Sequence, residues 1–231
     1  MTIAKEAAGR RAADYVSSGM VVGLGTGSTA FYFIDEIGRR IQNGTLTDIR
    51  AVSTSSQSEA QAKSLGIPTV NMDDVQYIDV LVDGADETLK TFSGIKGGGG
   101  ALLLEKIVAQ SSRRIIWIVD EGKVVEQLGA FPLPVEVVRF GSWNLFYKFD
   151  EAGMNPRFRK SGRDSLFLTD SDNYIIDLQL NEIPNPAQLN FELNNVVGVV
   201  EHGLFLNYPE TIIIGKEDGT IEEIHREQPQ A

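Results

Sequence analysis

The chain has 231 residues, 42% of them apolar, which predicts one large domain, or one domain with a smaller insert, around a real core. The net charge of −11 repels nucleic acid and anionic lipid, so neither is an expected partner. No apolar run approaches the roughly 20 residues of a membrane span. The charged N-terminal stretch does not form a signal peptide. We therefore expect a cytoplasmic protein that contacts neither nucleic acid nor a membrane.

The side chains that the sequence lacks restrict its chemistry further. Without cysteine the chain has no thiolate nucleophile, no disulfide and no sulfur-ligated metal. Its two histidines are His202 and His225, and the second lies in a polar tail. A histidine-based triad or a multi-histidine metal site is therefore not expected. Any reaction must use carboxylates, lysines, hydroxyls and backbone amides.

The first half of the chain alternates between helical and extended patterns. Ser28 or Thr29 is a candidate N-cap for the second helix. Strands that alternate with helices indicate a doubly wound, mostly parallel sheet. The predicted helices cover residues 3–17, 29–42, 56–65 and 101–111, and the predicted strands cover residues 20–25, 49–53, 67–71, 77–82 and 113–119.

A second pattern follows the proline-rich segment 131–134, which we expect to be an extended linker. The β-α-β-β-α-β order after it is that of a ferredoxin-like domain. A last strand, 211–214, returns to the first sheet. We therefore predict an α/β fold in which a smaller α+β domain, residues 131–206, is inserted into a catalytic Rossmann-like domain of residues 1–130 and 207–231. The elements of the insert are strand 135–140, a helix with Trp143, Phe146 and Phe149, a hairpin of 166–169 with 174–180, a helix from Pro186 to about Asn194, and strand 199–207.

The first of three glycine-centred loops is Val22-Gly-Leu-Gly-Thr-Gly-Ser-Thr29, between a strand and a helix. Such a loop offers an anion free N–H groups and the positive end of a helix dipole. Ser28 falls where a dinucleotide motif has its third glycine, and no GxxxxGK[ST] is present. A small phosphate or sugar therefore suits the loop better than NAD or ATP. A tight turn capped by Ser28 is the alternative.

The second loop, Val82-Asp-Gly-Ala-Asp-Glu87, follows an apolar strand. Ligands of open α/β sheets bind beyond such strand ends, so Asp83 and Asp86 are expected to point into a cleft. These carboxylates can hold sugar hydroxyls or a divalent cation, although no other acidic cluster is tied to them by spacing. A turn with helix-capping acids is the plain alternative.

The third loop is Lys96-Gly-Gly-Gly-Gly-Ala-Leu-Leu-Leu-Glu-Lys106, and its four glycines are too costly conformationally to serve packing alone. Lys96 places a positive charge beside their amides. Glu105 shares a helix face with Ala101 and Ala109, which leave room for a ligand. The helix N-terminus lowers the pKa of Glu105 and burial raises it. Glu105 is therefore a candidate general base, or else a charge that serves the helix dipole.

Together these loops resemble ribose-5-phosphate isomerase, type A. VGLGTGSTA (22–30), VDGADE (82–87), KGGGGALLLEK (96–106) and VDEGKVV (119–125) occur in that family's order and spacing. The resemblance implies an aldose–ketose isomerase of the non-oxidative pentose phosphate pathway that interconverts D-ribose 5-phosphate and D-ribulose 5-phosphate. It implies no metal or organic cofactor, and a homodimer or tetramer. It assigns the general base to Glu105 and the ligand contacts to Lys5, Thr26, Gly27, Ser28, Thr29, Asp83, Gly84, Ala85, Asp86, Lys96, Gly97, Gly98, Gly99 and Lys123.

The residues present predict how such a reaction runs. One carboxylate, Glu105, moves a proton between C2 and C1 through an enediolate, which Lys96 and the amides of 97–100 stabilise. Asp83 and Asp86 hold hydroxyls and assist proton transfer between oxygens. The alternatives are a glucosamine-6-phosphate deaminase type of enzyme, which has a similar phosphate loop, and a sugar-phosphate-sensing domain of a transcriptional regulator. The pairing of VDGADE with KGGG…EK argues against the first, and the acidic chain argues against the second.

Overall fold

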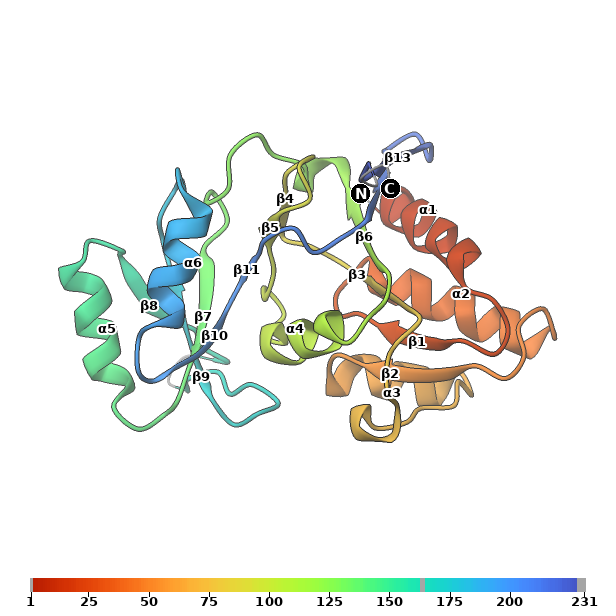
Figure 1. Ribbon diagram of the computed structural model, residues 1–231, viewed down its shortest axis with the longest axis horizontal. Helices are drawn as coiled ribbons and strands as arrows, with labels where there is room; N and C mark the ends of the chain where they lie inside the picture. Colours follow the sequence, from red (N-terminus) through yellow and green to blue (C-terminus); the bar gives the residue numbers. More distant parts are fainter. Residues whose placement is uncertain (1, 163–164, 228–231) are drawn as a thin grey trace.

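The computed structural model describes residues 2–162 and 165–227, and its larger part is built on a six-stranded sheet (Figure 1). The strand order is β13-β12-β6-β3-β1-β2, and all neighbours are parallel except β12 and β13. The strands are β1 (Val21–Leu24), β2 (Arg50–Ser53), β3 (Val80–Asp83), β6 (Ile115–Asp120), β12 (Thr211–Gly215) and β13 (Ile221–His225).

Helices cover both faces of this sheet, which confirms the doubly wound prediction. On one face α1 to α3 bury Ala8, Phe33 and Ala62 against the strands. On the other face α4 packs Val108 against the sheet near Trp117. The strands read as continuous apolar runs because parallel strands are buried on both faces. The helices are α1 (Thr2–Ala12), α2 (Ala30–Gln42), α3 (Ser56–Ser64) and α4 (Leu102–Gln110), with short 3-10 turns at Ala13–Tyr15, Met72–Asp74 and Glu121–Lys123.

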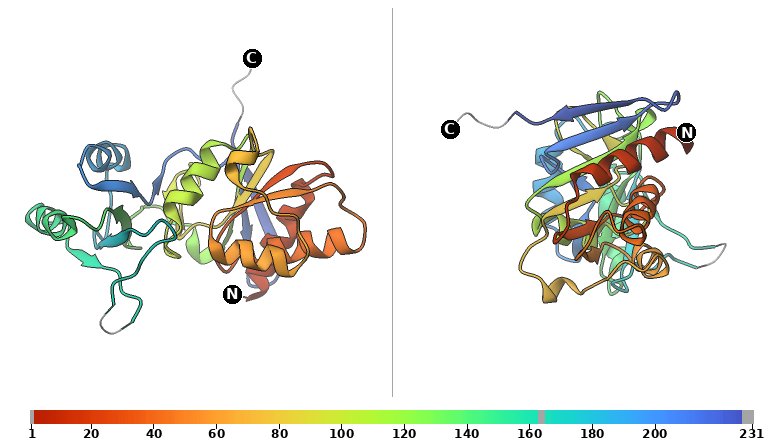
Figure 2. Two further views of the ribbon diagram at one scale, coloured as in Figure 1. Left: turned by 90° about the horizontal axis from the view of Figure 1, so that it is seen from below. Right: turned by 90° about the vertical axis from the view of Figure 1, so that its right-hand side faces the viewer.

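The smaller part is a four-stranded antiparallel sheet with two helices. Its order, β10-β7-β9-β8, is the ferredoxin-like arrangement that the sequence predicts. The helices α5 and α6 lie on the side away from the larger part, and α4 contacts β7 and β10 (Figure 2). The elements are β7 (Leu133–Val137), α5 (Ser142–Glu151), β8 (Pro156–Phe158), β9 (Tyr174–Leu178), α6 (Pro186–Asn194) and β10 (Val199–His202).

A three-stranded sheet, order β11-β5-β4, joins the two parts, and the sequence does not predict it. Gly203 divides the expected strand 199–207, because its N–H donates to Pro134 of the small sheet and its carbonyl accepts from Lys96 N–H. A Cβ at Gly203 would lie 2.3 Å from the Lys96 oxygen, so only glycine fits this close approach. The strands are β4 (Glu87–Thr88), β5 (Gly94–Ile95) and β11 (Leu204–Phe205).

Other local predictions differ from the structure in part or in full. The proline-rich linker becomes part of β7. Pro134 lies just beyond Val135, the last residue of β7 that pairs with β10, so its missing N–H breaks no hydrogen bond of that ladder. Segments 67–71 and 166–169 form single bridges rather than strands, and the partner of β9 is β8. The polar tail contains edge strand β13, and its Glu223 accepts hydrogen bonds from Arg11 and Tyr15. Thr29 is the N-cap of α2, but neither it nor Ser28 makes a side-chain cap bond.

Candidate active site

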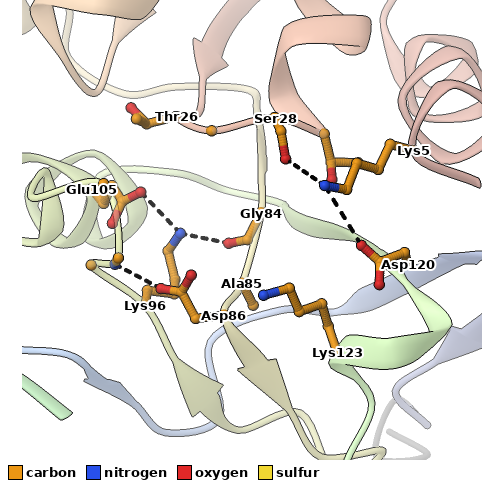
Figure 3. A pocket seen from close by; sticks show the side chains of 15 residues that line it. Lys5, Thr26, Ser28, Gly84, Ala85, Asp86, Lys96, Glu105, Asp120 and Lys123 are labelled. Carbon is orange, nitrogen blue, oxygen red and sulfur yellow. Dashed lines mark hydrogen bonds and ion pairs between the residues drawn. The ribbon is translucent and has the colours of Figure 1, made fainter. Parts of the chain in front are cut away.

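One cavity of about 130 Å³ opens at the carboxyl ends of β1, β3 and β6 (Figure 3). Every site residue that the sequence predicts, except Asp83, lines this cavity, and Asp120 is an additional lining residue. Parallel strands bring their carboxyl ends to the same sheet edge, so loops distant in sequence meet there. The lining residues are Lys5, Thr26, Gly27, Ser28, Thr29, Gly84, Ala85, Asp86, Lys96, Gly97, Gly98, Gly99, Glu105, Asp120 and Lys123.

The end of the cavity formed by the first glycine loop combines the N-terminus of α2 with Lys5, in the upper part of Figure 3, and Lys123 approaches from the lower right of that view. Lys5 of α1 donates from Nζ to Ser28 Oγ at 2.9 Å, and the same Nζ lies 4.0 Å from Asp120 Oδ2. Lys123 reaches the cavity from the 3-10 turn after β6. Gly27, at φ +110°, turns the chain into α2. Free N–H groups, the dipole of α2 and two lysines make this a site for an anion.

The opposite wall holds a buried cluster of one lysine and two carboxylates. Lys96 Nζ donates to the Gly84 carbonyl at 2.6 Å, and lies 3.0 Å from Asp83 Oδ2 and 3.2 Å from Glu105 Oε1. Lys96 and Glu105 are 3% and 4% exposed. The other oxygen of Glu105, Oε2, is buried and accepts no hydrogen bond from the described residues. Glu105 therefore lines the cavity with one carboxylate oxygen held and the other unsatisfied.

Burial and charge shift the pKa of both partners upward. Burial raises the pKa of Glu105, and the neighbouring Asp83 and Asp86 add to this, while Lys96 opposes it. Burial alone would lower the pKa of Lys96, but the carboxylates of Asp83, Glu105 and Asp86 raise it overall. Lys96 is therefore a permanent cation at neutral pH, and Glu105 binds protons more readily than an exposed glutamate.

Asp83 does not point into the cavity, contrary to the sequence prediction. Its side chain is fully buried, and Oδ1 accepts from the N–H groups of Thr26 at 3.0 Å and Gly84 at 2.8 Å. The cause is close packing: a Cβ at Gly25 would lie 2.3 Å from Asp83 Oδ1, so the glycine loop covers this carboxylate. Asp83 thus ties the first loop to Lys96, while Asp86 lines the cavity and accepts from Gly98 N–H at 2.7 Å.

Asp120 is the cavity residue that sequence reasoning missed. It ends β6 just as Asp83 ends β3, so its position beyond an apolar strand was the available signal. Among the residues that the structure describes, no group of three or more His, Cys, Asp or Glu side chains is arranged to hold a metal ion. No helix within those residues is long and apolar enough to cross a membrane.

The fold and the site together define an α/β enzyme that acts by proton transfer on a small anionic ligand. Comparison with known proteins identifies the family. Residues 50–219 match the family model of ribose 5-phosphate isomerase A (phosphoriboisomerase A), and the chain belongs to this family. Ribose-5-phosphate isomerase A of Streptococcus sanguinis (strain SK36) is 55% identical over 215 residues, which cover 93% of this chain and 95% of that protein. The enzyme of Limosilactobacillus reuteri (strain DSM 20016) is 52% identical, with coverage of 93% and 94%.

Solved structures agree with this assignment. The ribose 5-phosphate isomerase from Plasmodium falciparum superposes with a TM-score of 0.92 at 34% identity, covering 99% of this chain and 100% of that chain. A D-ribose-5-phosphate isomerase in complex with phospho-erythronic acid gives a TM-score of 0.92 at 35% identity, with coverage of 96% and 97%. The α/β fold and the family predicted from the loop motifs are therefore confirmed.

Proposed function

We propose that Glu105 moves the proton in the reaction of this aldose–ketose isomerase, the interconversion of D-ribose 5-phosphate and D-ribulose 5-phosphate in the non-oxidative pentose phosphate pathway. The carboxylate removes the proton from C2 of the open-chain aldose, and the C1 carbonyl oxygen becomes the anionic oxygen of an enediolate. The same carboxyl group then returns the proton to C1, while the O2 proton moves to O1. Carbon 2 thereby becomes the ketone, and no metal or organic cofactor takes part in any step.

The unpartnered Oε2 of Glu105 is the observation that carries this proposal. A buried carboxylate oxygen without a hydrogen-bond donor is costly, and because Glu105 lines the cavity, this oxygen is available to a ligand. The raised pKa of Glu105 makes it a stronger base than an exposed glutamate, and Lys96 keeps a fraction of it ionised. The helix-dipole alternative explains neither the burial nor the orphaned oxygen.

The donors beside Glu105 stabilise the anionic intermediate. We assign this role to Lys96, 3.2 Å from Glu105, and to the amide of Gly99, which lines the same cavity. Removing one such donor from an enzyme typically costs about 10²–10³ in rate. Asp86 is placed to hold a sugar hydroxyl and to pass a proton between oxygens. Asp83 acts indirectly, because it positions Lys96 and does not itself reach the cavity.

The phosphate binds at the opposite end, in this proposal. Thr26, Gly27, Ser28 and Thr29 present backbone and hydroxyl donors there, and Lys5 and Lys123 add positive charge. Asp120 beside Lys5 keeps that ammonium group in place. The net charge of −11 opposes the approach of a phosphate, so capture depends on these local donors.

Glu105→Gln tests the base assignment, because glutamine keeps the shape and hydrogen bonds but accepts no proton. General base catalysis contributes about 10²–10⁴-fold, so turnover of ribose 5-phosphate should fall by the upper end of that range or more. Binding, followed as the ligand-induced rise in melting temperature, should be retained. Glu121→Gln, an exposed carboxylate outside the cavity, is the matched control. Turnover above about a tenth of wild type in Glu105→Gln would refute the assignment.

We also propose the domain division of the chain and its assembly. Residues 131–206, which contain β7 to β10, form the small domain, and residues 1–130 with 207–231 form the catalytic one.

The small domain exposes Phe140 by 95% and Val197 by 96%, and a hydrogen bond from Val138 to Gly198 brings these two segments together. Such a patch favours a homodimer, or a tetramer, in the cytoplasm. The mass from sedimentation equilibrium tests this, and a mass of 25.3 kDa would contradict it.

A further inference from the structure

An arginine of the small sheet reaches the glycine loop from outside the cavity. Arg159 follows β8, and its Nη1 donates to the carbonyl oxygens of Gly97 at 2.7 Å and Gly98 at 3.1 Å. Its Nε and Nη2 donate to the two carboxylate oxygens of Asp177 in β9. The Arg159 side chain is 14% exposed, and Arg159 is not among the cavity-lining residues. The mechanism above does not use it.

These contacts set the direction of two peptide groups in the loop. In a trans peptide the C=O and N–H groups point in opposite directions. Because the carbonyls of Gly97 and Gly98 face Arg159, the N–H groups of Gly98 and Gly99 face away from it. The Gly98 N–H donates to Asp86 at 2.7 Å, on the cavity wall. The Gly99 N–H likewise points away from Arg159, and Gly99 lines the cavity.

The loop depends on an outside partner for this orientation. Glycines rotate freely, and the four here have no side chains to hold them. Gly97 and Gly100 have φ values of +102° and +82°, and the Gly100 N–H closes a turn onto the Gly97 oxygen at 3.0 Å. That turn leaves the Gly98–Gly99 peptide to be held by Arg159. Phe167 packs on the same loop, since a Cβ at Gly100 would lie 2.4 Å from its ring.

We propose that Arg159 is a positioning residue for the isomerase reaction, one that keeps the Gly99 N–H aimed at the anionic oxygen of the enediolate. This inference rests on the proposed function. The ion pair with Asp177 fixes the guanidinium plane and offsets its charge, so Arg159 acts through its two carbonyl hydrogen bonds. The planar guanidinium group can bond the two carbonyls and the Asp177 carboxylate at the same time, which the single ammonium group of lysine cannot do.

Arg159→Met is the direct test, with Arg157→Met as its matched control. Arg157 lies two residues earlier on β8, is exposed, and does not line the cavity. Misdirecting an oxyanion donor should lower the rate somewhat less than deleting that donor does. We therefore expect kcat of Arg159→Met to fall about 10–100-fold. KM should change by less than about threefold, because the donor acts on charge that develops only in the transition state. The control should match the wild type in both constants.

Two further variants separate positioning from a role in folding alone. Arg159→Ala should regain at least about fivefold in kcat when millimolar guanidinium chloride is added, because the free cation can donate to the same carbonyls. Arg159→Lys keeps the charge beside Asp177 and loses the double contact, so its kcat should fall about tenfold. Should Arg159→Met fail to fold, as judged by its melting curve, the measurement on Arg159→Lys decides.

The outcomes that overturn the proposal differ from those that refute Glu105. A folded Arg159→Met or Arg159→Lys with kcat within twofold of wild type overturns it. So does a rise in KM without a fall in kcat, or a loss that guanidinium does not restore in Arg159→Ala. If Glu105→Gln retains turnover while Arg159→Met loses kcat, the base assignment fails and the positioning role stands. If both lose kcat, both assignments are supported.

Discussion

Replacing Lys96 by methionine removes the cation of the buried cluster while keeping most of its volume. Lys96 Nζ lies 3.0 Å from Asp83 and 3.2 Å from Glu105, and both carboxylates are almost fully buried. Without the lysine, Asp83 becomes an uncompensated buried charge. Breaking a buried ion pair from one side typically costs about 3–5 kcal/mol in the free energy of unfolding. For a chain of this size, that corresponds to a fall of about 6–20 °C in melting temperature.

The same substitution changes the reaction in two ways. The enediolate loses a donor, so kcat should fall about 10²–10³-fold at neutral pH. Lys96 also lowers the pKa of Glu105, which burial raises, so its removal lets that pKa rise further. Because only the carboxylate form of Glu105 accepts a proton, the rise of kcat with pH should move to higher pH in Lys96→Met. Part of the lost rate should return in alkaline buffer.

Urea denaturation at pH 7 and a pH profile of kcat measure these effects. Lys96→Met with Asp83→Asn is the companion variant, because it removes the charge that the first change leaves unpaired. The pair should recover about 1–3 kcal/mol of the lost stability, as expected for residues in one network. The reasoning fails if Lys96→Met melts within about 2 °C of wild type, or if its pH profile stays where that of the wild type lies.

Two other groups give predictions of different kinds. Lys123 lines the phosphate end, so Lys123→Met should raise KM in initial-rate assays more than it lowers kcat. A loss confined to kcat would show that Lys123, rather than Lys96, stabilises the intermediate. Burial lowers the pKa of His202 from 6.5 to about 3. Between these two pH values the imidazole is protonated in the unfolded state and neutral in the folded state. Stability should fall by up to about 1.4 kcal/mol per pH unit as pH drops from 6.5 toward 3. In urea denaturation at pH 5 and 7, His202→Asn should flatten this slope; an unchanged slope would show that other groups cause it.

The sequence by itself determined the secondary structure of the catalytic sheet and the positions of its loops. Buried parallel strands require apolar runs, such as Ile115–Asp120, and helices between them require a 3.6-residue period. Both signals are local. Glycines that need positive φ or close approach, such as Gly27 and Gly97, also show directly in the chain. Because strand ends converge in an α/β sheet, the loop positions placed all but one of the predicted ligand residues at the cavity.

Only the tertiary structure decided which polar groups face the ligand and which support the site from behind. Asp83 and Asp86 stand in one motif, yet packing under the first glycine loop buries Asp83 and leaves Asp86 at the cavity. Arg159 lies 62 residues from Gly97, and no local pattern links them. The break at Gly203 depends on a meeting of three strands from different parts of the chain. Hydrogen bonds and steric contacts between distant segments exist only after the chain has packed, so a local reading of its residues does not contain them.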